Sequence, residues 1–290
     1  MNERYFPYLF FLPSVVFLVA IVIYPMLFAF ETSFRDWLMT NPEAGKPFVG
    51  LENYKMIMHD PRFWSDLGNT LYYTVLSVSA SFSVGLGLAL LMNGIVRGRS
   101  ILRTIFLIPM VMTPIVVGFG FRFMFNYELG VLNYLLSVLG LPRKAFLGDP
   151  SLALNSIILV DIWQWTPFMV LVLLAGLESL PKEPFEAARI DGAPEWQVFR
   201  HITLPLMKPV ILVALLIRTM DAMRDFDKIY VMTAGGPGIA SETLSLYDWK
   251  VGFSWWRMGY ASALGLLLLF LVTVIGWSYV KSISFGEEKK

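Results

Sequence analysis

The sequence predicts an all-α membrane protein whose helices cross a bilayer about six times. Hydrophobic residues make up 56% of the 290 residues and charged residues only 16%, which does not suit a water-soluble surface. The mean hydropathy is +0.61. A spanning helix needs about 20 apolar residues. Stretches of that kind occur at residues 8–30, 67–92, 101–125, 152–177, 204–223 and 260–280.

The first apolar stretch is predicted to be a membrane anchor and not a cleaved signal peptide. It is long enough to span the hydrocarbon core, whereas the apolar region of a signal peptide is about 7–15 residues long. In addition, no small-x-small cleavage site follows it before Glu31 and Arg35. We therefore expect this segment to remain in the protein as the first span.

Lysine and arginine in the short loops predict the orientation of the helices. The connection after the second span holds Arg97, Arg99 and Arg103 without an acidic residue, so it is expected in the cytoplasm. Basic residues in the longer outer segments weaken this bias, but they count less there. Both termini then also face the cytoplasm, where the terminal basic residues are Arg4, Lys281, Lys289 and Lys290.

Composition and missing motifs exclude several classes of function. A net charge of +1 without long single-sign runs gives no reason to expect a nucleic-acid partner. The chain has no cysteine, and its two histidines, His59 and His201, lie far apart, so neither a catalytic nor a metal site is predicted. The phosphate-binding Gly-x-x-x-x-Gly-Lys-Ser/Thr motif is also missing; residues 94–100 lack its spacing and its lysine. ATP hydrolysis by this chain is therefore not expected.

The loop after the fourth span is predicted to form two short helices joined at a corner. The first begins near Pro184 and ends at Gly192, because glycine accepts the left-handed conformation of a helix end. Pro194 and Glu195 suit the first turn of the second helix.

Each of these two helices presents an apolar ridge on a loop that should otherwise be polar. Phe185 and Ala188 lie three residues apart, as do Trp196 and Phe199. Two interpretations follow from the residues alone. The hairpin rests against the protein's own helices or the lipid headgroups, or it is a docking site for another protein.

The same loop resembles the EAA loop of binding-protein-dependent ABC importers. The matching residues are Glu186-Ala-Ala188, Gly192 and the Ile202-x-Leu-Pro205 sequence. The resemblance implies a six-transmembrane-helix, type I ABC importer permease fold with a cytoplasmic coupling helix that seats in the ATP-binding subunit. It implies that role for Glu186, Ala187, Ala188, Asp191, Gly192 and Ala193.

Polar and aromatic residues inside the predicted spans are the second candidate site. A charge at the bilayer centre costs about 2.5 to 3.5 kcal/mol, so it should face the bundle interior with a partner or a function. Either these groups lock helices together, or they line a solute path in which carboxylates bind sugar hydroxyls and aromatic rings stack on the sugar. The candidates are Asp161, Trp163, Gln164 and Trp165 in the fourth span, Arg218, Asp221, Ala222 and Asp225 at the end of the fifth, and Asn126 after the third.

Three further stretches resemble the sugar-importer branch of that family, near the substrate-carrying membrane subunit of maltose transporters. They are Arg103-Thr-Ile-Phe-Leu-Ile-Pro109, Trp163-x-x-x-Pro167 and residues 226–237. In that relative the sugar contacts come from the stretches that correspond to residues 161–165 and 218–225, which implies the same role here. This chain has Arg and Asp where a maltose carrier is rich in Asn, Ser and Phe.

Together these resemblances imply a complete transport machine. Residues 1–66 are expected to be an N-terminal anchor with an outer loop, and residues 67–290 a core permease domain with its coupling loop at 178–205. The implied partners are a second, similar permease subunit, two ATP-binding subunits that hold ATP and magnesium, and an extracytoplasmic solute-binding protein, in a prokaryotic inner membrane. A mono- or oligosaccharide is the expected cargo. Polyols or glycerol phosphodiesters stay open as cargo, since Arg218 and Arg224 could serve a phosphate, and an ion-coupled secondary transporter is the rival class.

Overall fold

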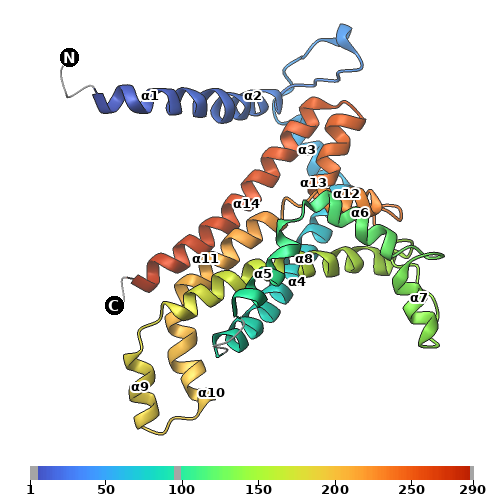
Figure 1. Cartoon of the computed structure of the whole chain (residues 1–290). Helices are drawn as coiled ribbons and strands as arrows, with labels where there is room; N and C mark the ends of the chain where they lie inside the picture. Colours follow the sequence, from blue (N-terminus) through green and yellow to red (C-terminus); the bar gives the residue numbers. More distant parts are fainter. Residues whose placement is uncertain (1–5, 95–98, 288–290) are drawn as a thin grey trace. The chain divides into compact units, whose positions relative to one another are not determined.

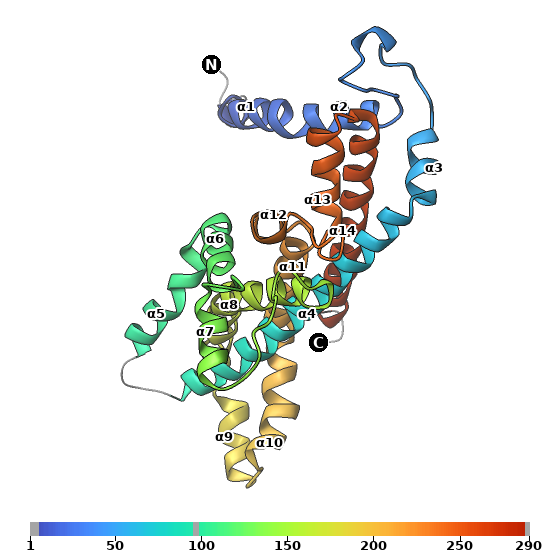
Figure 2. The ribbon, with the colours of Figure 1, turned by 90° about the vertical axis from the view of Figure 1, so that its right-hand side faces the viewer.

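The computed structural model describes residues 6–94 and 99–287, and these residues are almost entirely helical (Figures 1 and 2). Arg4, Arg97, Lys289 and Lys290, on which the predicted orientation partly depends, lie outside them. Five helical segments within the described ranges are long and apolar enough to cross a membrane. They are Phe11–Thr32, Pro61–Asn93, Pro150–Glu178, Glu195–Ala222 and Met258–Ser282.

The third predicted span is the exception, because it is not one continuous helix. Residues 101–125 fall on α5 (Arg99–Val111) and α6 (Pro114–Met124), which are separate helices. Proline cannot donate the next backbone hydrogen bond, and it pushes the residue before it out of the helical region. Thr113 accordingly has the extended angles φ −64° and ψ 140°. The average hydropathy of the stretch predicted a span but could not predict this break.

The chain forms two compact units, Met1–Ser65 with Tyr247–Leu271 and Asp66–Leu246 with Val272–Lys290. The expected boundary between an anchor at 1–66 and a core at 67–290 stays a prediction. The first unit holds α1 (Phe6–Leu18), α2 (Tyr24–Thr32), α3 (Glu52–His59), the second half of α13 (Leu244–Trp249) and the first half of α14 (Met258–Glu287).

A cluster of hydrogen bonds around Asp60 connects distant segments of the first unit. Its carboxylate accepts hydrogen bonds from Tyr247 Oη at 2.5 Å and from Tyr260 Oη at 2.9 Å. The guanidinium of Arg62 lies 5.1 Å from the ring centre of Tyr247 and 5.0 Å from that of Trp255. These contacts join the end of α3 to residues almost 200 positions later in the chain.

A second carboxylate of this unit, Asp248, borders a cavity of about 360 Å³ whose lining includes Met26, Phe253 and Gly265 but no lysine or arginine. Burial raises the pKa of Asp248 to about 7. The ordinary value of an aspartate is about 3.9, so the folded unit holds this proton more tightly than the unfolded chain does. The stability that this group contributes is therefore fully present below about pH 4 and is lost as pH rises through about 7.

This pKa predicts a pH-dependent stability. Between pH 5 and pH 8 the melting temperature of the purified protein should fall, and Asp248→Asn should remove part of that fall and raise the melting temperature at pH 8. Scanning fluorimetry at both pH values measures the melting temperatures, with Glu43→Gln in the exposed segment between α2 and α3 as the control. Identical pH profiles for Asp248→Asn and the unchanged protein would contradict the assignment.

The second unit contains the helices that carry both candidate sites. They are α4 (Pro61–Asn93), α5, α6, α7 (Val131–Val138), α8 (Pro150–Glu178), α9 (Glu183–Ile190), α10 (Glu195–Val198), α11 (Leu204–Ala222) and α12 (Asp227–Thr233). The turn of residues 199–203 is π-helical and joins α10 to α11 without a break. The second helix of the predicted hairpin is thus continuous with the fifth predicted span.

Glycines bring the central helices of this unit close together. A Cβ atom on Gly85 of α4 would lie 2.5 Å from Met169 Cβ of α8, and one on Gly176 of α8 would lie 2.8 Å from Val210 Cγ1 of α11. Side chains larger than hydrogen would therefore push these helices apart. Close packing of α4, α8 and α11 places the polar residues of three spans within reach of one another.

Candidate functional site: a buried ion network and a coupling hairpin

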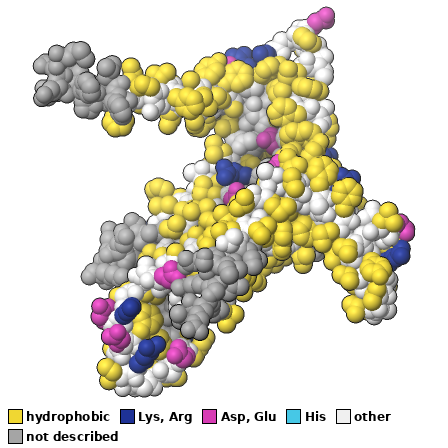
Figure 3. Space-filling view, viewed as in Figure 1, with side chains coloured by type: hydrophobic (Ala, Val, Ile, Leu, Met, Phe, Trp, Pro, Cys, Tyr) yellow, Lys and Arg dark blue, Asp and Glu magenta, His cyan; other side chains and the backbone are white. Residues whose placement is uncertain are grey.

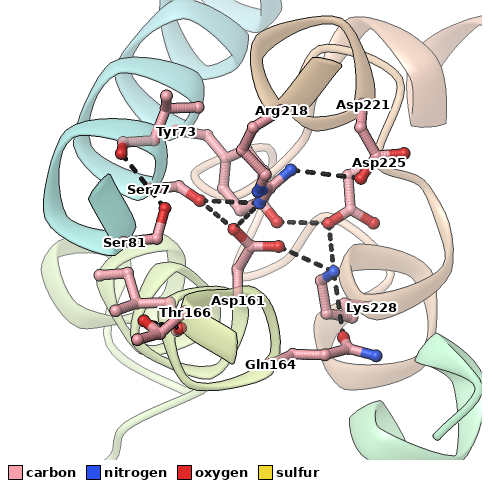
Figure 4. A network of polar contacts seen from close by, with 12 residues as sticks. Tyr73, Ser77, Ser81, Asp161, Gln164, Thr166, Arg218, Asp221, Asp225 and Lys228 are labelled. Atoms are coloured by element: carbon pink, nitrogen blue, oxygen red, sulfur yellow. Dashed lines mark hydrogen bonds and ion pairs between the residues drawn. The ribbon is translucent and has the colours of Figure 1, made fainter. Parts of the chain in front are cut away.

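Asp161 of α8 is the centre of a buried ion network in the second unit (Figure 4). Its side chain is 0% exposed. The carboxylate accepts hydrogen bonds from the Arg218 guanidinium of α11 and from the Ser77 hydroxyl of α4. Its other oxygen lies 2.8 Å from Lys228 Nζ of α12. One carboxylate thus joins four helices.

Arg218 is the first of two cations that neutralise this carboxylate. Its side chain is 1% exposed, and its guanidinium also lies 3.2 Å from Asp221 Oδ2 and 3.1 Å from Ser77 Oγ. The guanidinium carbon is 5.2 Å from the ring centre of Trp165, which is a cation–π contact. The arginine is therefore surrounded by groups of this same chain.

Lys228 is the second cation. Its ammonium lies 2.7 Å from Asp225 Oδ2 and 3.3 Å from Gln164 Oε1, in addition to its contact with Asp161. Tyr73 of α4 donates a hydrogen bond to Asp225. Burial alone would lower the pKa of Lys228, but the carboxylates of Asp225 and Asp161 raise it above its ordinary value, so the side chain stays charged.

An open cavity of about 330 Å³ adjoins the network. Trp165 Nε1 is buried without a hydrogen-bond partner among the described residues, whereas the side chain of Asp221 is 43% exposed. The volume is at the lower end of the range typical of small-molecule sites. The cavity is lined by Pro114, Trp165, Asp221, Arg224, Asp225, Phe226, Asp227 and Lys228.

Six of the nine substrate candidates meet in the network or the cavity, and three do not. Trp163 is 42% exposed and packs its ring 5.1 Å from that of Phe121. Asn126 accepts hydrogen bonds from two backbone amides of the next turn, and Ala222 is buried without a polar group. The six that meet are Asp161, Gln164, Trp165, Arg218, Asp221 and Asp225.

Asp225 reaches the network by a different route from the one its spacing suggested. The spacing of Arg218, Asp221, Ala222 and Asp225 in the sequence predicts one helix face, but α11 ends at Ala222. The turn that follows is closed by a hydrogen bond of 3.2 Å from Asp225 N to Ala222 O. The turn, and not the helix, directs the carboxylate toward Lys228.

Sequence reasoning missed Tyr73, Ser77 and Lys228. A signal for the first two existed, because Tyr73, Ser77 and Ser81 lie four residues apart on one face of the second predicted span. Lys228 follows Asp225 by three residues at the start of α12, outside the predicted apolar spans. Only tertiary packing shows that this lysine is 1% exposed.

The predicted corner is present in the hairpin formed by residues 178–205, which we call the coupling hairpin. α9 ends at Ile190, and Gly192 has φ +69°. The amide of Gly192 donates to Arg189 O at 3.2 Å and that of Ala193 to Ala188 O at 2.9 Å, the hydrogen-bond pattern of a glycine-capped helix end. The sequence and the backbone therefore agree on why the chain turns here.

The hairpin has an inner and an outer side. Its apolar ridges face a groove of about 970 Å³ lined by Phe185, Trp196 and Phe199 together with residues from the ends of α4 and α8. Ala188 is buried, whereas Glu186, Ala187, Asp191 and Gly192 are exposed and Ala193 is partly so. Charged side chains gather on the hairpin, while the long helices present mainly hydrophobic surface (Figure 3).

No group of three or more His, Cys, Asp or Glu residues that could hold a metal ion is found within residues 6–94 and 99–287. The network is built of carboxylate–cation pairs. Its chemistry is binding and pairing of charges.

Comparison with known proteins decides the family. The family model described as the binding-protein-dependent transport system inner membrane component matches residues 81–281. The chain belongs to this family. It is therefore a multi-pass inner membrane protein and the permease component of a binding-protein-dependent ABC importer, in which ATP hydrolysis is the work of a separate subunit. Membership of this family excludes the alternative that the chain is an ion-coupled secondary transporter.

Relatives of this transport component are similar over almost their whole length. The trehalose/maltose transport system permease protein of Thermococcus litoralis is 40% identical, covering 99% of this chain and 96% of that protein. The sulfoquinovosyl glycerol transport system permease protein of Agrobacterium fabrum is 37% identical, with 98% and 92% covered. The trehalose transport system permease protein of Mycobacterium tuberculosis is 35% identical, with 97% and 89% covered.

The fold of this component also matches a solved structure. A chain of a bacterial ABC transporter that imports the acidic polysaccharide alginate superposes with a TM-score of 0.85 and 25% identity, covering 98% of this chain and 96% of that chain. The same transporter has been solved in complex with an alginate pentasaccharide-bound periplasmic protein. The expected importer permease fold is thereby confirmed.

Proposed function

We propose that this permease moves a neutral sugar through the cavity beside the ion network. The observation that carries the proposal is the lining of the cavity, where the indole of Trp165 lies beside the carboxylates of Asp221 and Asp225. An aromatic ring offers a surface for a sugar ring, and carboxylates accept hydrogen bonds from hydroxyl groups. The 40% identical trehalose/maltose permease supports the same cargo class.

The charges around the cavity favour a neutral solute over an anion. Both buried cations are already paired, Arg218 with Asp161 and Asp221, and Lys228 with Asp161 and Asp225. A phosphodiester or an acidic sugar would have to break these pairs or rely on the exposed Arg224 alone. Arg218 is thus a supporting residue of the site and not the anion ligand that the phosphodiester alternative requires.

The exposed outer side of the coupling hairpin completes the proposed mechanism. Ala187, Asp191 and Gly192 present small and acidic groups that suit close contact with an ATP-binding subunit, while Glu186 is exposed and also lines the groove. The predicted orientation places this hairpin and both termini in the cytoplasm. A second, similar permease subunit and an extracytoplasmic binding protein complete the machine that we propose, and alternating access moves the sugar inward.

Uptake into proteoliposomes tests the cargo. The whole complex with its binding protein is given ATP and radiolabelled trehalose, with maltose, glycerol, glycerophosphodiesters or glucuronic acid as competitors. Neutral sugars should compete strongly and the two anions weakly. Strong competition by the phosphodiester alone would overturn the neutral-sugar proposal.

A cavity variant tests the site itself. Asp221→Asn removes a charge that can accept a hydroxyl hydrogen bond worth about 1.5–3 kcal/mol, so uptake efficiency should fall about 10- to 100-fold. Glu128→Gln is the matched control. The side chain of Glu128 is 71% exposed, lies away from the cavity and pairs with Arg143 at a distance of 3.2 Å. Equal uptake by Asp221→Asn and the control would show that the cavity is not the route.

A further inference from the structure

Lys228, in the first turn of α12, is a buried lysine. Its side chain is 2% exposed, and its ammonium faces Asp161 Oδ1, Asp225 Oδ2 and Gln164 Oε1 at 2.8, 2.7 and 3.3 Å. An ammonium has three N–H donors, so these three acceptors use its full capacity. The lysine is therefore fully engaged.

These three acceptors belong to two different parts of the unit. Asp161 and Gln164 lie one helical turn apart on α8, whereas Asp225 lies in the turn between α11 and α12. No other cation pairs with Asp225 among the described residues. One buried charge thus clamps α8 to the α11–α12 turn, and the clamp exists only while all three helices keep this arrangement.

The clamp forms part of the cavity wall. Asp225 and Lys228 line the cavity and also belong to the network, so a solute in the cavity touches the clamp directly (Figure 4). Just beside it, Trp165 Nε1 and Arg218 Nε are buried without hydrogen-bond partners among the described residues. Buried polar groups that lack partners destabilise an arrangement. The closed arrangement therefore leaves bonds to be gained when the helices move or a solute arrives.

We propose that Lys228 is a positioning residue that holds the translocation path closed until a solute in the cavity competes for Asp225. The inference rests on the proposed function, because it takes the cavity as the route of the solute. Hydroxyl groups that bind Asp225 weaken its pairing with Lys228, and α8 then loses one of its two ion-pair links to the α11–α12 region, the other being Asp161 with Arg218. Solute binding and opening are in this way linked through one ion pair.

The rate of ATP hydrolysis without sugar is the test. In the complete complex in proteoliposomes, Lys228→Gln should raise the sugar-free rate several-fold and reduce its further stimulation by binding protein and sugar. Lys228→Arg keeps the charge and should stay closer to the unchanged complex. Lys144→Gln is the matched control, because Lys144 is exposed and away from the cavity.

A second variant guards against a folding defect. The Lys228→Gln, Asp225→Asn double variant removes one positive and one negative charge, so no carboxylate of that pair is left unpaired. It should also hydrolyse ATP faster than the unchanged complex when sugar is absent. The inference would be overturned if either assembled variant hydrolysed ATP without sugar at the unchanged rate. It would also be overturned if neither variant assembled. The sugar-free rate of ATP hydrolysis is measured without cargo. An error in the assigned cargo would therefore be seen only in the uptake assay with competitors.

Discussion

Replacing Gly192 with valine is expected to abolish ATP-driven uptake while the protein still folds. Gly192 turns the coupling hairpin at φ +69°, a conformation that costs a non-glycine residue about 1–3 kcal/mol and a β-branched residue the most. No atom lies within 4 Å of the Cβ that valine would add, so the loss comes from the backbone and from blocked docking. Uptake assays and co-purification of the ATP-binding subunit measure the two effects.

A glycine with the same geometry elsewhere provides the control for this substitution. Gly140, in the turn after α7, has φ +72° and likewise has no atom within 4 Å of an added Cβ. Gly140→Val should lose a comparable amount of stability but keep transport. If Gly192→Val transported normally, or if both variants lost transport equally, the coupling role of the hairpin would be refuted.

Asp161→Asn is expected to be the most destabilising change in the network. It leaves Arg218 and Lys228 buried with one carboxylate partner fewer each, and removal of one partner of a buried pair typically costs about 3–5 kcal/mol. Asp221→Asn breaks the other pair of the same arginine, but its carboxylate is 43% exposed, so the expected loss is about 1 kcal/mol or less.

Melting temperatures of the two purified variants compare these effects directly. A large decrease for Asp161→Asn with a small one for Asp221→Asn is the expected result. Together with the uptake assay, this result would show that Asp161 supports the site and that Asp221 faces the solute. Equal decreases would mean that burial does not set the energetics of the network.

The spans and the hairpin could be predicted because the responsible signals are local. Apolar length alone predicted six spans, five of which are helices long enough to cross a membrane, and Gly192 with the prolines around it indicated the corner of the hairpin. The break before α6 was also encoded locally, in Pro114, but an average over 25 residues conceals a single proline.

The network could be predicted only in part because its partners are distant in the sequence. Asp161 and Arg218 were expected inside the membrane, and each needed a partner, yet no local rule pairs residues 57 positions apart. Lys228 was harder still, since its sequence neighbours suit an exposed turn as well as a buried one. Close packing of α4, α8 and α11 at Gly85 and Gly176 decides which polar groups meet.

ATP hydrolysis by the purified complex tests whether this chain couples a sugar cavity to a separate ATPase. The complex is purified through a tag on this chain, and its ATP hydrolysis is measured with the binding protein and a panel of sugars. We expect the ATP-binding subunits to co-purify and one neutral sugar, with its binding protein, to stimulate hydrolysis several-fold. Absence of a co-purifying ATPase, or stimulation by an anionic solute and by no neutral sugar, would contradict it.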